Sequence, residues 1–346
     1  MSPSQQHAPG IPERQKNAPM WSGGRRGGAH RRGGEQMMVP RATFTSYYGR
    51  PVVKKPVWQE RDIAGYLFTG GIAAGSALLA AGAELSGRTH LRRATRLSSM
   101  AALGISGVAL VHDLGRPERF YNMLRVFKPT SPMSVGSWIL SAFALPVGVG
   151  FADEVPALLP RPLRRLVRRL SPAAAVGGAV LGSGVATYTA VLLADTAVPA
   201  WHAAYPELPF VFAGSALSGS AGLALVLTPP DETGPAQRLA LLGAALELTA
   251  SQRLEHRLGL VGEPYKKHPS GRKMKLAKAM TLGGVVASTM LGRRSRTLAV
   301  LSGAALFASS ALTRFAIFEA GVTSTEDPAY TVVPQRERAG RRDASP

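Results

Sequence analysis

Two ionisable residues, His112 and Asp113, close an apolar stretch, and a basic, aromatic loop separates them from a second apolar stretch that opens at Ser134. Ionisable groups are costly where a membrane helix meets water, so their presence indicates a function. Imidazole and carboxylate groups can exchange protons with a bound molecule, and hydroxyl groups can donate hydrogen bonds to it. The chemistry expected here is proton exchange with a small polar headgroup at the mouth of a helix.

Further polar residues interrupt the apolar stretches later in the chain, namely Tyr188, Asp195, Ser215, Glu247 and Arg314. Asp195 and Glu247 are costly within a membrane helix unless they are protonated, paired or hydrated. One interpretation is structural, with Arg314 paired to Glu247 or Asp195 as a lock between helices. The other is that some of these groups bind a quinone headgroup, which needs hydrogen-bond donors to both carbonyls and a proton path on reduction. The residues alone leave both interpretations open.

Eight apolar segments position these residues. They cover residues 63–85, 97–114, 135–155, 173–198, 208–227, 236–258, 276–291 and 298–320. Most of them approach the ~20 residues that a helix needs to cross the hydrocarbon core, whereas the sixth and seventh are marginal. Because backbone groups cannot stay unpaired in lipid, each segment is predicted to be a helix, and the fold class is an all-α membrane protein. The patterns Gly71–Gly75 and Gly178–Gly182 indicate close helix packing.

The apolar segments lie in the middle of the chain, between two polar ends, and the whole chain is strongly basic. The chain has 41 Lys and Arg residues against 21 Asp and Glu, a formal charge of +20, which suits nucleic acid or an anionic membrane surface. The apolar segments favour the membrane and argue against nucleic acid. Residues 1–57 are predicted to be a disordered basic tail, residues 58–322 the membrane domain, and residues 323–346 a polar C-terminal tail.

Two kinds of cofactor find no support in the sequence. The chain contains no cysteine, which excludes thiolate metal sites and iron–sulfur ligation by the chain itself. A haem held by two histidines needs them to face each other within membrane helices, whereas only His112 and His256 lie near predicted helix ends. Neither haem nor a metal is expected in this chain.

A resemblance to a known family rests on three stretches, which read YLFTGGIAAGSALLAA (66–81), HDLGRPERFYNMLRVFKPTSPMSVGSW (112–138) and TYTAVLLADTAVPAW (187–201). With these stretches the chain resembles the NrfD/PsrC family, the membrane subunits of polysulfide-reductase-like and formate-dehydrogenase-like molybdoenzyme complexes. Residues 212–224 and 314–321 add weaker likeness. The later stretch EDPAYTVVPQR looks most like the versions that accompany formate dehydrogenases.

The resemblance implies eight transmembrane helices arranged as two four-helix bundles, with a quinone site in the first half. The quinone-site positions that it carries over by motif are His112, Asp113, Tyr188 and Ser215. Arg116 and Arg119 would contact a partner subunit or fix their loop, and the glycines Gly70, Gly71 and Gly75 would permit close helix approach. Asp195, Glu247 and Arg314 remain as an ion pair or a proton path.

The resemblance also implies partners and a location. The cofactor would be a quinone or quinol, either menaquinone or ubiquinone, and membrane lipid would surround the chain. The protein partners would be a four-cluster ferredoxin-like iron–sulfur subunit and a molybdenum or tungsten bis-pterin catalytic subunit. The chain would cross the inner (plasma) membrane several times. Two alternatives remain at this point: a proton or solute transporter, and a purely structural membrane anchor.

Overall fold

The computed structural model describes residues 51–114, 116, 118, 120–290, 292 and 295–343. Most of the predicted basic tail at 1–57 and the last three residues therefore lie outside the described residues. All the regular structure within the described ranges is helical, as the absence of alternating apolar patterns predicts. The long helices are α1 (Glu60–Leu85), α2 (Thr89–Asp113), α4 (Pro132–Glu154), α5 (Arg161–Ala194), α7 (Leu208–Leu227), α8 (Gly234–Arg257), α9 (Pro269–Met290) and α10 (Arg296–Glu326).

Shorter helices connect or extend the long ones. They are α3 (Phe120–Met123), η3 (Pro156–Leu158), α6 (Pro199–Ala203), η4 (Gly259–Tyr265) and α11 (Ala329–Asp343). The C-terminal segment, expected only to be polar, thus forms the helix α11. Local chemistry sets two of the long helix starts. Ser131 caps α4 and accepts a hydrogen bond from the backbone N–H of Ser134, and Ser295 caps α10 in the same way.

Each long helix covers most of one of the eight predicted apolar segments, and several helices begin well before their segment. α2 begins at Thr89 and α5 at Arg161, whereas the apolar segments begin at 97 and 173. The added turns are rich in arginine. Hydrophobicity marks only the part of a helix that suits lipid, while arginine continues a helix well in water or at a membrane surface.

Six of these helices are long and apolar enough to cross a membrane: α1, α2, α4, α5, α7 and α10. The sequence predicts eight membrane-crossing helices. In the described chain, six helices have the length and composition that a crossing needs. The other two, α8 and α9, are less apolar. α8 carries Glu247, Arg253 and Glu255 along its length, and the first half of α9 carries several lysines.

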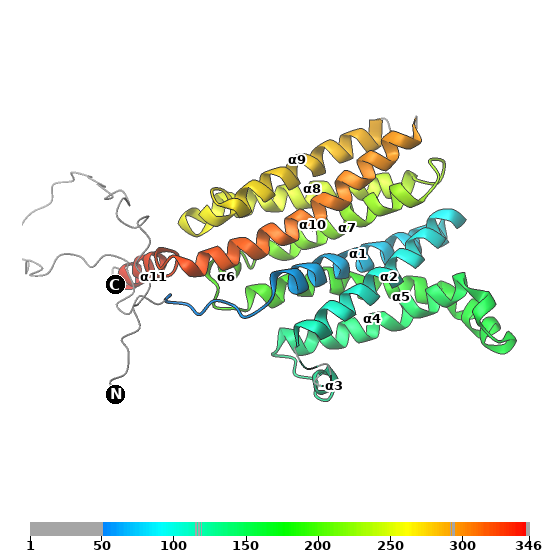
Figure 1. The fold of residues 1–346 in the computed structure, drawn as a ribbon, viewed down its shortest axis with the longest axis horizontal. Coiled ribbons are helices and arrows are strands. Elements are labelled where there is room, and N and C mark those ends of the chain that lie inside the picture. The colour runs from blue at the N-terminus through cyan, green and yellow to red at the C-terminus, as the bar shows by residue number, and fades with distance from the viewer. Residues whose placement is uncertain are drawn as a thin grey trace, which may run out of the picture. The chain divides into compact units, whose positions relative to one another are not determined.

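The long helices pack in two neighbouring sets, and Figure 1 shows them lying side by side. α1 packs on α2 and α5, while α4 packs on α5 and α2. In the second half, α7 packs on α8 and α10, and α9 packs on α10 and α8. α1 also packs on α7 and α10, so this helix joins the two sets.

Glycines allow α1 to lie close to its neighbours. A Cβ atom on Gly75 would lie 2.7 Å from the carbonyl oxygen of Ala216 in α7, and one on Gly182 of α5 would lie 3.1 Å from that of Ala74. Both positions come from the predicted close-packing patterns, which the structure confirms there. Close approach of backbones replaces the hydrophobic driving force that helices lack in lipid.

Candidate functional site

The structure places His112 and Asp113 at the end of α2, beside the beginning of α1. The Nδ1 atom of His112 lies 2.8 Å from Oδ2 of Asp62, and the backbone N–H of Gln59 donates to Oδ1 of Asp113 over 3.3 Å. The His112 side chain is 69% exposed, so it is open to solvent. Asp62 was not among the predicted site residues. Its only signal in the sequence is its position just before the first apolar segment.

A cavity of about 230 Å³ lies at the same end of the first helix set, in the connection from α2 to α4. Its lining residues all come from the loop, α3 and the first turns of α4: Asn122, Met123, Val126, Lys128, Ser131, Met133, Ser134 and Ser137. The cavity is thus built entirely from within the stretch 112–138, although none of its lining residues was predicted as a site residue. Methionine and valine make part of the wall apolar, while hydroxyl, amide and ammonium groups converge on it.

Ser134 holds the wall of this cavity together. Its hydroxyl donates to the carbonyl oxygen of Val126 over 3.1 Å and accepts from the backbone N–H of Lys128 over 3.0 Å. The side chain therefore ties the exposed loop to the first turn of α4. Since a hydroxyl has a single proton, Ser134 has no further donor to offer a ligand. Lys128 and Asn122 remain as donors on this wall.

Tyr188 of α5 packs against the beginning of α4. Its ring occupies the space in which a Cβ atom on Gly136 would stand, and the following residue, Ser137, lines the cavity. Gly136 is therefore required for the ring to approach α4 so closely. The hydroxyl of Tyr188 makes no hydrogen bond to the described residues, which leaves it able to serve a ligand.

Ser215, also predicted for the quinone site, faces a different helix. Its hydroxyl lies 3.0 Å from that of Ser310 in α10, and Ser310 donates to the carbonyl oxygen of Ser215 over 2.8 Å. Both side chains are fully buried between α7 and α10. The structure thus brings Tyr188 against Gly136, the residue before the cavity-lining Ser137, but directs Ser215 away, into the second helix set.

Glu247 and Arg314 lie buried in this second set. Glu247 accepts hydrogen bonds from Thr313 over 2.8 Å and from Ser218 over 3.2 Å. Arg314 donates to the carbonyl oxygen of Phe212 over 2.7 Å and lies over the ring of that residue, while its Nε and Nη1 atoms have no hydrogen-bond partner in the described chain. Glu247 is therefore satisfied by hydroxyl groups and not by a direct hydrogen bond from Arg314.

Asp195 does not belong to this buried cluster. α5 ends at Ala194, and Asp195 is the exposed residue that follows it. The prediction that Asp195 lies within a helix and can pair with Arg314 was wrong, because the apolar segment continues past the end of α5. Of the two arginines predicted to meet a partner, Arg116 is exposed in the loop, and Arg119 lies outside the described residues.

The comparison with known families now bears on this geometry. The family described as polysulphide reductase, NrfD, matches residues 52–231, which is more than half of the chain. The chain belongs to the NrfD family. No curated protein matches it. The NrfD match covers the cavity, His112, Asp113 and Tyr188, and it ends before Glu247 and Arg314. Together with its six apolar helices, it makes the chain a multi-pass membrane protein.

No group of three or more His, Cys, Asp or Glu residues that could hold a metal ion occurs in the described part of this NrfD chain. The polar groups at this end of the first helix set are hydroxyl, amide, amino, imidazole and carboxylate groups. Hydroxyl and amino groups can donate hydrogen bonds, and the exposed His112, which contacts the half-buried Asp62, can exchange protons with water.

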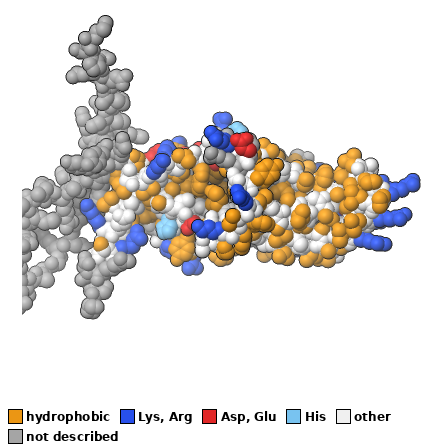
Figure 2. Space-filling model, turned by 90° about the horizontal axis from the view of Figure 1, so that it is seen from below, with side chains coloured by type: hydrophobic (Ala, Val, Ile, Leu, Met, Phe, Trp, Pro, Cys, Tyr) orange, Lys and Arg blue, Asp and Glu red, His pale blue; other side chains and the backbone are white. Residues whose placement is uncertain are grey.

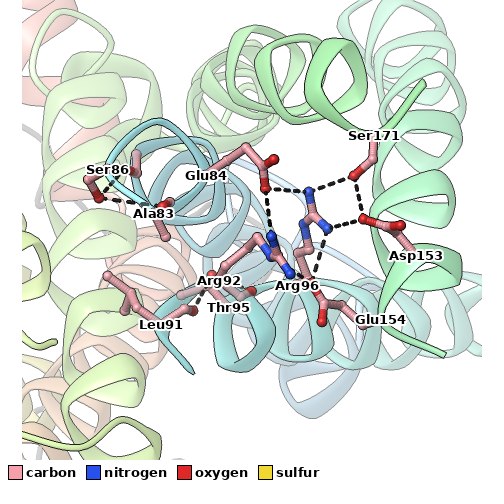
Figure 3. Close-up of polar contacts among 11 residues, drawn as sticks. Ala83, Glu84, Ser86, Leu91, Arg92, Thr95, Arg96, Asp153, Glu154 and Ser171 are labelled. Atoms are coloured by element: carbon pink, nitrogen blue, oxygen red, sulfur yellow. Dashed lines mark hydrogen bonds and ion pairs between the residues drawn. The ribbon is translucent and has the colours of Figure 1, made fainter. Parts of the chain in front are cut away.

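The other end of the first helix set in this NrfD protein carries a charge network, drawn in Figure 3. Arg96 of α2 is only 4% exposed and pairs with Asp153 at 2.9 Å, Glu154 at 3.0 Å and Glu84 at 3.1 Å. It also donates to the hydroxyl of Ser171 over 2.8 Å. The network therefore ties α1, α2, α4 and α5 together where their apolar parts end.

We expect Arg96→Met to destabilise the folded protein strongly. Removing one member of a buried ion network leaves unpaired buried charge and costs about 3–5 kcal/mol. Arg92, which is 31% exposed and pairs with Glu84 and Glu154, provides a matched control. Arg92→Met should cost about 1 kcal/mol or less. Thermal unfolding in mild detergent measures both, and equal midpoints for the two variants would contradict a buried anchoring role of Arg96.

We expect Ser134→Ala to loosen the cavity loop while leaving the helices folded. Two hydrogen bonds worth about 1 kcal/mol each disappear, so the loop should open at least about tenfold more often. The measurement is the rate of trypsin cleavage after Arg125, which is exposed in this loop. Ser141→Ala is the control, because its hydroxyl bonds only back to Ser137 within α4. A cleavage rate at Arg125 unchanged from wild type would exclude the proposed tie.

Proposed function

We propose that this NrfD chain is the quinone-reactive membrane subunit of a redox complex. It exchanges electrons between the membrane quinone pool and a four-cluster iron–sulfur subunit, which serves a molybdenum or tungsten bis-pterin enzyme. The observation that carries the proposal is the cavity in the connection from α2 to α4, which joins an apolar wall to donors at Asn122 and Lys128. The exposed His112, which contacts Asp62, ends the helix that leads into this connection, and both lie within the segment matched by the family. Formate oxidation is the first candidate for the coupled reaction, because of the C-terminal resemblance.

The proposed membrane arrangement is eight crossings in two four-helix bundles, within the plasma membrane. The contacts within α1, α2, α4 and α5, and within α7, α8, α9 and α10, support this grouping. α8 and α9 would cross the membrane although they are less apolar, because their neighbours cover part of their polar groups. Glu247 of α8, for example, is 3% exposed and receives hydrogen bonds from α7 and α10.

The proposed site differs from the one derived by motif, because it loses one residue and gains two from the cavity wall. It comprises His112, Asp113 and Tyr188 with the cavity wall at Asn122 and Lys128, and it leaves out Ser215. The 230 Å³ cavity offers an apolar wall for a ring and donors for its carbonyl oxygens. A bound quinone, menaquinone or ubiquinone, would supply the redox chemistry. Tyr188 and Lys128 would orient its carbonyl groups, and His112 with Asp62 and Asp113 would exchange protons between the site and water.

A second function has one specific observation in its favour. The buried Arg314 keeps two nitrogen atoms without a partner in the described chain, close to the buried Glu247 and several hydroxyl groups. Such groups suit the passage of protons through the second helix set. Proton transfer of this kind would accompany the quinone reaction, or replace it if the chain is a transporter. A purely structural anchor would need neither the cavity nor this cluster.

Purification of the tagged chain from native membranes in mild detergent tests the assembly. We expect iron, together with molybdenum or tungsten, in subunits that co-purify, because electrons must reach a quinone through closely spaced redox centres, which the proposal places in the partner subunits. The measurements are partner identification by mass spectrometry and metal analysis. A well-expressed chain recovered alone and metal-free would favour the transporter or anchor alternatives.

Site variants in the assembled complex test the quinone site. His112→Ala should lower quinone turnover by about 100-fold or more, because a positioned proton donor contributes about 10²–10⁴. Tyr188→Phe should lower it about tenfold through one lost hydrogen bond. Ser215→Ala is the matched control and should retain wild-type turnover, since its hydroxyl faces Ser310. Full turnover in both His112→Ala and Tyr188→Phe would exclude this site.

A further inference from the structure

The helix α5 is longer than a membrane crossing requires. It has 34 residues, which at 1.5 Å per residue span about 51 Å, whereas the hydrocarbon core is about 30 Å thick. Pro172 lies inside the helix and separates an arginine-rich beginning from the apolar remainder. The remainder, residues 173–194, is itself long enough to cross the core. The beginning, residues 161–171, therefore extends past the hydrocarbon.

This beginning of α5 has two different exposed faces. Five arginines lie on one side and are all exposed: Arg161, Arg164, Arg165, Arg168 and Arg169. Leu163, Leu166 and Leu170 are spaced by three and four residues, which places them together on the opposite side of the helix. Their side chains are 41%, 52% and 45% exposed. Only Val167 and Ser171 are buried in this segment. Neither the arginine face nor the leucine face is covered by the rest of the described chain.

The charge network ties the end of this segment to α2 and α4. Ser171 donates to Oδ2 of Asp153 over 2.8 Å and accepts from Arg96, as Figure 3 shows. The nearby carboxylates, Glu84, Asp153 and Glu154, are engaged with Arg92 and Arg96. They do not pair with the five arginines of α5 in the described chain. Figure 2 shows Lys and Arg side chains projecting from the end of the described unit at which α5 begins.

We propose that residues 161–171 form an interfacial segment that binds anionic phospholipid headgroups. A helix with arginines on one face and leucines on the other, placed where a membrane-crossing helix leaves the hydrocarbon, matches the pattern of helices that lie in the headgroup region. The leucines enter the acyl boundary, and the positive charges of the arginines attract the lipid phosphates. The exposed leucine face favours lipid over an acidic protein, because a soluble acidic partner would leave these leucines in water.

The test uses the full-length protein in neutral detergent, with added phosphatidylglycerol or phosphatidylcholine as probes. Thermal unfolding at increasing lipid concentration reports the apparent affinity for each lipid, because a ligand that binds the folded state raises the midpoint. The test variant carries Arg164→Gln, Arg165→Gln, Arg168→Gln and Arg169→Gln. The control variant carries Arg61→Gln, Arg238→Gln, Arg272→Gln and Lys275→Gln, which removes four exposed charges elsewhere.

We expect wild type and the control variant to prefer phosphatidylglycerol over phosphatidylcholine. The test variant should bind phosphatidylglycerol at least about tenfold more weakly, because each basic residue near an anionic surface contributes about fivefold to the affinity. The corresponding Arg→Lys variant should recover most of this loss. Three results would overturn the proposal: no preference in wild type, an unchanged preference in the test variant, or equal loss in the control. If the test variant cannot be recovered, the wild-type preference must still weaken in 1 M salt, and a preference insensitive to salt would exclude headgroup binding.

Discussion

Hydrocarbon offers no hydrogen-bond partner to a peptide group, and the whole structure depends on this constraint. Every crossing segment must be helical, and helices in lipid adhere through close packing instead of a hydrophobic driving force. α1 meets this requirement with glycines and alanines that bring its backbone against α5 and α7. Because α1 joins the two helix sets, its small residues determine where the polar groups of all its neighbours come to lie.

Polar groups in this fold are sorted by depth. His112 and Asp62 lie at one end of the first helix set, where His112 is open to water. The cavity lies in the connection that follows α2 at this end. Arg96 and its carboxylates lie at the other end, where the apolar parts of four helices stop. Glu247 and Arg314 lie buried between these levels in the second set. An exposed pair beside a cavity suits exchange with a ligand and with water, whereas a buried, saturated network suits anchoring.

The region matched by the family does not include the buried cluster of Glu247 and Arg314. The match ends at residue 231, after α7, and so includes the cavity, its loop and Tyr188. Glu247 and Arg314 lie beyond it, in α8 and α10. The proposed quinone chemistry therefore uses the first helix set, while any proton passage through Glu247 would use the second. α1 and α5 both pack on α7 and so connect the two sets.

The sequence by itself determined the helical class, the approximate place of each long helix and the stretch that contains the cavity. These follow from local properties, because apolar length and backbone pairing need no knowledge of neighbours. Only the tertiary structure decided that Ser215 faces Ser310, that Asp62 meets His112, and that Asp195 lies at an exposed helix end. In helices that are apolar nearly all round, periodicity does not indicate which face meets which neighbour, so residues distant in sequence are brought together by packing alone.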